Sequence, residues 1–185
     1  MSETLEQFKI GHFGFSGVHP NDLGASEYTL VTLVCDRSGS TSGFQQEMES
    51  CIKEIVKACQ MSPRADNLLL RFITFNQNFK EHHGYKLLEA VNLGDYDGSL
   101  PPGGDTSLFD STLNGVEATA NYGEELNKQD YQTNAIVFIL TDGRDNKSAH
   151  TANSVRESLN KILEGESLES VTTVLIGVNV QNPMV

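Results

Sequence analysis

Cysteine, basic residues and long apolar runs are all scarce in this chain of 185 residues, and each shortage argues against a class of protein. Three cysteines are an odd number and do not form a disulfide framework, so we expect reduced thiols in a cytoplasmic protein. No apolar run reaches the ~20 residues of a membrane-spanning helix. Residues 1–10 carry acids instead of the basic and apolar pattern of a signal peptide.

The shortage of basic residues also bears on the choice of partner. The chain has 13 lysine and arginine residues against 25 aspartate and glutamate residues, which gives a net charge of −12. Affinity for nucleic acid comes mostly from basic side chains on phosphates. We therefore expect neither a nucleic acid nor a membrane as partner.

What the chain does contain is a regular alternation of apolar strands and amphipathic helices. Hydrophobic residues make up 38% of it, enough for the core of one domain at this length. Apolar and β-branched runs predict buried strands at 28–35, 67–75, 135–140 and 171–178, with shorter strands within 79–88. Apolar residues three and four positions apart predict helices at 44–60, 108–122 and 151–163.

Strands that are apolar along their whole length are covered on both faces, which is typical of parallel sheets. The alternation therefore predicts an α/β fold, with a doubly wound, mostly parallel sheet flanked by helices. Residues 1–27 show only a weak alternation of apolar and polar residues. We interpret 1–27 as an N-terminal extension with one edge strand, and 28–185 as the domain.

Polar segments follow the predicted strands where open α/β sheets bind their ligands, beyond the carboxyl ends of the strands. Residues 36–40 (DRSGS) follow the first buried strand and 141–143 (TDG) follow the third, while 103–107 (GGDTS) precede the middle helix. These segments offer carboxylate and hydroxyl oxygens but neither sulfur nor imidazole. They therefore predict a site for Mg²⁺, with Mn²⁺ or Ca²⁺ as alternatives, in preference to Zn²⁺.

Together the three segments resemble the metal-ion-dependent adhesion site of von Willebrand factor A (vWA) domains. The pattern of that family is Asp-x-Ser-x-Ser, then a distant Thr and a distant Asp. The resemblance covers roughly 28–178 and implies a Rossmann-like vWA fold, although Asp105 is inserted between the glycine pair and the threonine. The metal ligands that it implies are Asp36, Ser38, Ser40, Thr106 and Asp142.

The resemblance implies a protein-binding module and not an enzyme. In the family, an acidic side chain of the partner completes the metal coordination, so we expect a protein ligand with an exposed Asp or Glu, within a multiprotein assembly. The family also adds a further strand and a C-terminal helix, for which residues 179–185 are too few. We expect the domain to lack these elements, or the N-terminal extension to cover that edge of the sheet.

Two other functions stay open. One is a metal-dependent hydrolase or phosphotransfer domain, although Ser38 replaces the second acid of the Asp-x-Asp pattern and no positioned base or nucleophile is evident. The other is a scaffold domain whose metal loops no longer function. Arg37, Arg144 and Lys147 flank the metal loops, either as solvated charges or as residues that steer an acidic partner to the cation.

Overall fold

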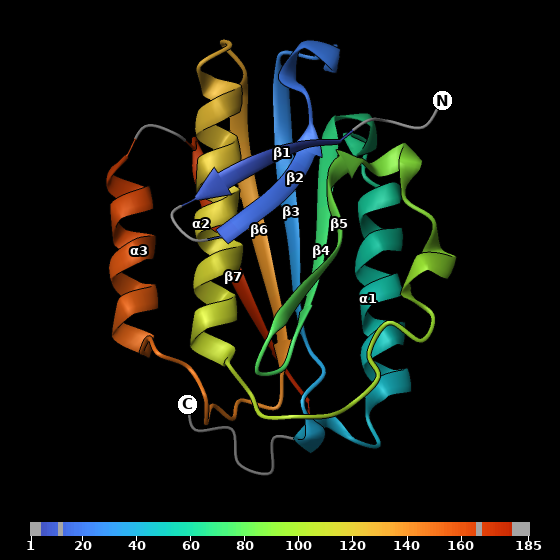
Figure 1. The fold of residues 1–185 in the computed structure, drawn as a ribbon. Helices are drawn as coiled ribbons and strands as arrows, with labels where there is room; N and C mark the ends of the chain where they lie inside the picture. Colours follow the sequence, from blue (N-terminus) through green and yellow to red (C-terminus); the bar gives the residue numbers. More distant parts are fainter. Residues whose placement is uncertain (1–4, 11–12, 166–167, 179–185) are drawn as a thin grey trace.

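The computed structural model describes residues 5–10, 13–165 and 168–178, which form a seven-stranded sheet with helices on both faces (Figure 1). The strand order is β1-β2-β5-β4-β3-β6-β7. The strands are β1 (Leu5–Ile10), β2 (Phe13–Val18), β3 (Glu27–Asp36), β4 (Leu68–Phe75), β5 (Phe79–Leu87), β6 (Gln132–Thr141) and β7 (Ser170–Gly177). The helices are α1 (Gln45–Gln60), α2 (Leu108–Asn127) and α3 (Ala152–Glu164). The predicted fold class is confirmed.

Strand β3 lies inside the sheet and pairs in parallel with β4 on one side and β6 on the other. Its register places Asp36 opposite Phe75, and Cys35 opposite Leu140, so the three strands end together. Strand β7 continues the parallel part beyond β6, whereas β5 runs antiparallel to β4. The loops that follow β3 and β6 therefore leave from the same end of the sheet, where the parallel strands finish, at the bottom of Figure 1.

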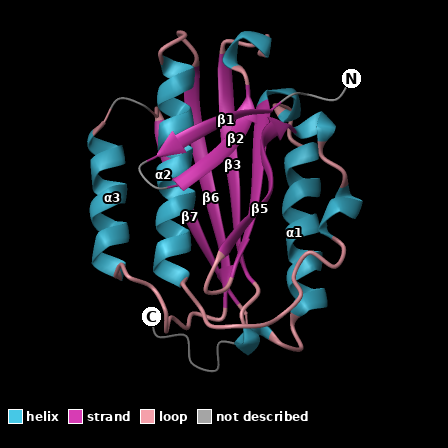
Figure 2. Cartoon of the chain, in the orientation of Figure 1, coloured by secondary structure: helices cyan, strands magenta, loops and turns pink. Residues whose placement is uncertain are grey.

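Two apolar cores lie on the two faces of this sheet, with α2 and α3 on one face and α1 on the other (Figure 2). On the α1 face, Met48, Ile52 and Val56 are fully buried against the sheet. Strands β3 and β4 contribute side chains to both cores, which explains their long apolar runs. No helix within the described ranges is long and apolar enough to cross a membrane.

The segment before β3 forms a hairpin of two strands, so the prediction of one edge strand is wrong. Phe8 of β1 stacks on Phe15 of β2 with ring centres 5.1 Å apart, and both rings pack edge-on against Tyr122 of α2. These aromatic contacts hold the hairpin at the β5 edge of the sheet, opposite β7. The N-terminal extension therefore does not cover the edge at β7. The predicted loss of the last strand and helix concerns residues 179–185, which lie outside the described ranges.

A basic side chain, that of Arg71, is buried inside the sheet. Arg71 of β4 has an exposed fraction of 0%, and its Nε donates to Oε2 of Glu81 on β5 at 2.7 Å. Its Nη2 donates to Oδ1 of Asn114 at 3.3 Å, and Nη1 has no hydrogen-bond partner in the described part of the chain. The other oxygen of Glu81 accepts from the backbone N–H and hydroxyl of Ser16, so the ion pair also holds the hairpin.

Replacing Glu81 with alanine should leave the Arg71 guanidinium buried without its counter-charge. We expect the free energy of unfolding to fall by about 3–5 kcal/mol, measured by urea denaturation at neutral pH. The double variant Arg71→Met/Glu81→Leu buries no charge and should recover most of this loss. A Glu81→Ala variant within about 1 kcal/mol of the parent, the range of an exposed pair, would contradict this account.

Candidate metal-binding site

Hydrogen bonds link the three polar loops at the carboxyl ends of the parallel strands. The N–H of Gly39 donates to the carbonyl of Gly104 at 3.0 Å, which joins the loop after β3 to the loop before α2. The N–H of Asn146 donates to the carbonyl of Thr106 at 3.1 Å, and Oδ1 of Asn146 accepts from the N–H of Thr106 at 2.8 Å. The loop before α2 is therefore held between the other two.

Asp36 ends β3 and is fully buried. Its Oδ1 accepts from the backbone N–H of Ser38 at 2.8 Å, and its Oδ2 accepts from the hydroxyl of Thr141 at 2.7 Å. Burial raises the pKa of Asp36, the hydrogen bonds from Ser38 and Thr141 oppose that shift, and the nearby charge of Asp142 adds to it. A cation beside Asp36 would favour its charged form.

The hydroxyls of Ser38 and Ser40 lie within hydrogen-bond distance of each other. Their Oγ atoms lie 3.1 Å apart, and Ser38 directly precedes the single turn of 3-10 helix (Gly39–Thr41) that contains Ser40. Neighbouring oxygens in an octahedral Mg²⁺ shell, at about 2.0–2.1 Å from the ion, are about 2.8–3.0 Å apart. The two hydroxyls therefore have the spacing of adjacent ligands of one cation.

Thr106 is buried, with 2% of its surface exposed, in spite of the inserted residue before it. Asp105 is exposed, and its N–H donates to Oε1 of Gln77 at 2.9 Å. Gly104 has a φ of +79°, and a Cβ atom at that position would lie 1.9 Å from Oε1 of Gln77. The glycine lets the chain turn outward at the insertion and return to a buried position at Thr106.

Asp142 follows β6 with a side chain that is only 5% exposed. Its Oδ1 accepts from the N–H of Arg144 at 3.1 Å, and its Oδ2 lies 3.9 Å from Nε of the same arginine. The Arg144 side chain is 76% exposed. The arginine therefore lies at the rim of the site, and no buried basic side chain pairs with Asp142 in the described part of the chain.

The structure thus brings Asp36, Ser38 and Ser40 into one hydrogen-bonded turn and places Asp142 close to Asp36. Thr106 lies in the loop that is bonded to Gly39. Within the described ranges, no three His, Cys, Asp or Glu side chains come close enough together to hold a metal ion. A cation at this edge would accordingly depend on hydroxyl oxygens for most of its protein ligands.

Sequence reasoning missed three residues that support the loops. Thr141 donates to Asp36, Nδ2 of Asn76 donates to the carbonyl of Gly103 at 2.8 Å, and Oδ1 of Asp145 accepts from the first N–H of α2 at 2.8 Å. A sequence signal existed for Thr141, a hydroxyl that ends an apolar strand directly before Asp142. Asn76 and Asp145 act across loops, and their spacing in the sequence carries no such signal.

Comparison with known structures identifies the fold. The chain superposes on the manganese-loaded TRAP protein of Plasmodium vivax with a TM-score of 0.55 and 19% identity, over 84% of this chain and 61% of that one. It superposes on proximal thread matrix protein 1 of the mussel byssus with a TM-score of 0.54 and 22% identity, over 82% of this chain and 35% of that one. At these identities the likeness concerns the fold, and that fold is vWA-like.

Comparison of sequences does not show a family for the chain. No protein-family model matches the chain. Over 134 residues it is 28% identical to submandibular gland protein C of Mus musculus, which covers 68% of this chain and 18% of that protein. The chain thus spans less than a fifth of the curated relative that it matches.

Thr141→Val should separate support of the loops from metal ligation. Valine keeps the shape of threonine but leaves Oδ2 of the buried Asp36 without its donor, so the metal-free protein should lose about 1–3 kcal/mol of unfolding free energy. Ser40→Ala, which removes a half-buried hydroxyl of the turn, should cost less than Thr141→Val. Urea denaturation in a chelating buffer measures both, and equal losses would refute the supporting role of Thr141.

Proposed function

We propose that this chain is a protein-binding module that depends on a divalent cation, Mg²⁺ or Mn²⁺ with Ca²⁺ as an alternative. Its ligands would be Asp36, Ser38, Ser40, Thr106 and Asp142. The observation that carries the proposal is the 3.1 Å spacing of the Ser38 and Ser40 hydroxyls, beside two acids with little or no exposure.

Each residue has a separate task in this proposal. Ser38, Ser40 and Thr106 offer neutral hydroxyl oxygens, while both oxygens of Asp36 already accept a hydrogen bond and so orient the turn. Asp36 and Asp142 supply the compensating charge, directly or through water. When bound, the cation supplies a positive centre with an open position that an acidic side chain of the partner can fill.

The names of the structural neighbours support binding over catalysis. The TRAP protein was solved loaded with manganese, and the byssus protein belongs to the matrix of a thread. Neither name is that of an enzyme. We therefore propose that this chain acts in adhesion or assembly. Its ligand would be a protein that carries an exposed Asp or Glu. A cytoplasmic location stays a prediction from the few cysteines.

The first test is metal binding by calorimetry. The parent chain should bind one Mg²⁺ or Mn²⁺, and Ser38→Ala/Ser40→Ala should abolish this binding, because it removes two neighbouring ligands. At a hundredfold excess of metal over Kd, the free energy of unfolding of the parent should rise by roughly 2.7 kcal/mol, because the metal binds only the folded state. Ser50→Ala, on the exposed face of α1, is the matched control and should bind like the parent.

Two results would sink the metal assignment. One is equal binding by the parent and the double-serine variant, and the other is no binding by the parent at millimolar metal. Binding of metal without any gain in affinity for an acidic peptide would leave a scaffold domain as the better description. Turnover of a phosphate ester in the presence of metal would instead favour the enzyme.

The second test concerns the basic residues at the rim, Arg37 and Arg144. They lie beside the metal loops of a chain with a net charge of −12, and should speed the approach of an acidic ligand more than they strengthen the final complex. Arg37→Gln/Arg144→Gln should slow association of a labelled peptide with one Asp flanked by Glu, by about tenfold at low salt. Stopped-flow fluorescence over a salt series measures this.

The matched control removes the same charge from the other end of the molecule. Arg64 follows α1 and Lys128 follows α2, both at the amino edge of the sheet, so Arg64→Gln/Lys128→Gln should barely change the association rate. If both double variants slow association equally, only total charge matters. If the rim variant matches the parent in rate and salt slope, the steering role is wrong.

A further inference from the structure

A hollow with polar walls lies between the turn that joins β4 to β5 and the start of α2. Its volume is about 300 Å³, and the residues that line it are Gln77, Asn78, Phe79, Ser107, Asp110 and Ser111. Pockets for small ligands have volumes of about 300–1,000 Å³. This hollow, called the α2 hollow below, therefore has room for one long side chain.

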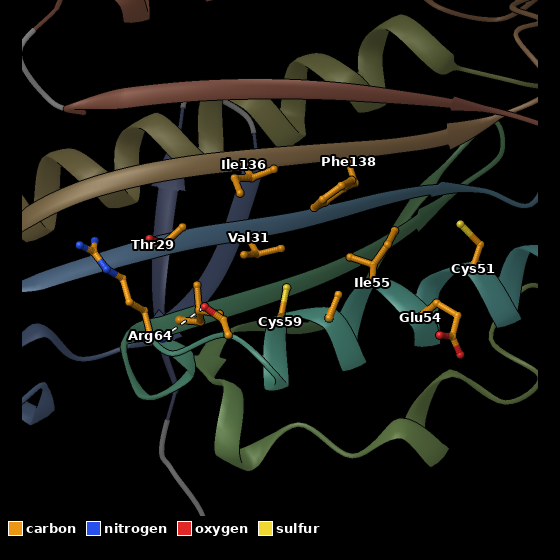
Figure 3. Close-up of a pocket in the computed structure, with 12 residues that line it drawn as sticks. Thr29, Val31, Cys51, Glu54, Ile55, Cys59, Arg64, Ile136 and Phe138 are labelled. Carbon is orange, nitrogen blue, oxygen red and sulfur yellow. Dashed lines mark hydrogen bonds between the residues drawn. The ribbon is translucent and has the colours of Figure 1, made fainter.

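The α2 hollow differs in character from the groove between α1 and the sheet, which has a volume of about 630 Å³. Figure 3 shows that the groove is walled mostly by apolar side chains, among them Ile55 of α1 and Ile136 and Phe138 of β6. Nothing in the described part of the chain shows what covers that groove. The polar side chains of the α2 hollow, in contrast, define the chemistry of an occupant.

The α2 hollow adjoins the candidate metal site. Ser107, on its wall, directly follows Thr106 in the chain. Oε1 of Gln77, also on its wall, accepts from the N–H of Asp105 at 2.9 Å. The wall then continues along the first turn of α2, a length of about 5 Å. A ligand group that binds the cation therefore lies about one helical turn from the hollow.

Two buried hydroxyls on the wall have no partner. Ser107 is 6% exposed and Ser111 is 2% exposed. Neither side chain makes a hydrogen bond to another described residue, although the N–H of Ser111 donates to the carbonyl of Ser107. A serine hydroxyl can donate one hydrogen bond and accept two. Both hydroxyls can therefore bind a polar group that enters the hollow.

Asp110 adds a negative charge to the wall. Partial burial acts to raise the pKa of Asp110, but hydrogen bonds from the N–H groups of Ala149 and His150 and from the His150 ring lower it overall. Within the described ranges, Asp110 forms an ion pair only with that ring, at 2.9 Å, and with no lysine or arginine. The acid is therefore available to a basic group of a ligand.

The start of α2 is not suited to an anion. The N–H of Leu108 donates to Oδ1 of Asp145 at 2.8 Å, and the N–H of Asp110 donates to Oγ of Ser148 at 3.1 Å. These helix donors are thus already used within the protein. Phe79, which is 36% exposed, adds an aromatic ring to the wall. A carboxylate, hydroxyl oxygens and an aromatic ring together favour a cationic group.

We propose that the α2 hollow binds a lysine or arginine side chain of the protein ligand whose acidic residue completes the metal coordination. This inference rests on the proposed function, because the cation fixes where the ligand runs. In an extended segment, side chains two residues apart lie on the same face, about 7 Å from each other. A basic residue two positions from the acid can therefore place its charge beside Asp110 and its apolar stem along Phe79.

Peptide binding in the presence of Mg²⁺ tests this subsite. One probe is a peptide with a single Asp and a Lys two residues away on each side. The other has norleucine in place of both lysines, which keeps the apolar stem and removes the charge. The parent chain should bind the lysine peptide about tenfold more tightly, equivalent to about 1.4 kcal/mol. Fluorescence anisotropy at about 150 mM salt, which screens long-range attraction, measures this preference.

Substitutions in the hollow separate a specific site from attraction by total charge. Asp110→Asn should remove most of the preference for lysine, and Ser111→Ala should reduce it several-fold, while calorimetry shows Mg²⁺ binding like that of the parent. Asp66→Asn, an exposed acid before β4 at the other end of the sheet, is the matched control and should keep the full preference. If Asp110→Asn disturbs folding or metal binding, Ser111→Ala decides. An undiminished preference in Ser111→Ala and in every folded Asp110 variant would overturn the proposal.

A titration without metal distinguishes this subsite from the metal-dependent function. In chelating buffer, n-butylammonium should shift the amide NMR signals of residues 77–79 and 107–111, whereas butyrate, which has the opposite charge, should not. If the parent binds Mg²⁺ and the Asp peptides but recognises neither lysine nor butylammonium, the subsite alone is wrong. If butylammonium shifts these signals but no metal binds, the metal-dependent function is wrong and the hollow remains a site for a basic group.

Discussion

The parallel register of β3 with its two neighbours is the constraint on which the rest of the molecule depends. Because Cys35 faces Leu140, the next residue of each strand places Asp36 beside Thr141, and the hydroxyl of Thr141 can reach the carboxylate at 2.7 Å. The apolar cores on both faces keep these strands in place. A shift of one residue would turn Asp36 toward the opposite face. The packing of the two cores therefore determines where the residues of the candidate site lie.

Backbone contacts between the loops then set the fine geometry. Gly39 donates to the loop before α2, and Thr106 exchanges hydrogen bonds with Asn146 of the loop after β6. These bonds do not involve the hydroxyls of Ser38 and Ser40, so the loops are ordered by contacts within the protein itself. The conformational cost of ordering the loops is met during folding, which favours tight binding by few ligands.

Much of this arrangement could be predicted from the sequence, because apolar runs and helical spacing report burial directly. The buried strands, the three helices and the edge of the sheet that carries the polar loops all follow from that pattern. The hairpin could not be predicted, since Phe8 and Phe15 pack on Tyr122, which is more than a hundred residues away. Arg71 lies within an apolar strand, and its partner Glu81 is identifiable only once β4 and β5 are paired.

The attachment of the hairpin has a consequence for the order of events during synthesis. Ser16 bonds to Glu81, 65 residues later, and the carbonyl of Pro20 accepts from Tyr131, 111 residues later. At roughly 5–20 residues per second, a ribosome needs about 5–20 s to make the second of these partners. The hairpin therefore leaves the ribosome before its partners and is among the last elements to find its place. Its apolar residues stay exposed to water for that interval, which is when a nascent chain is most prone to aggregate.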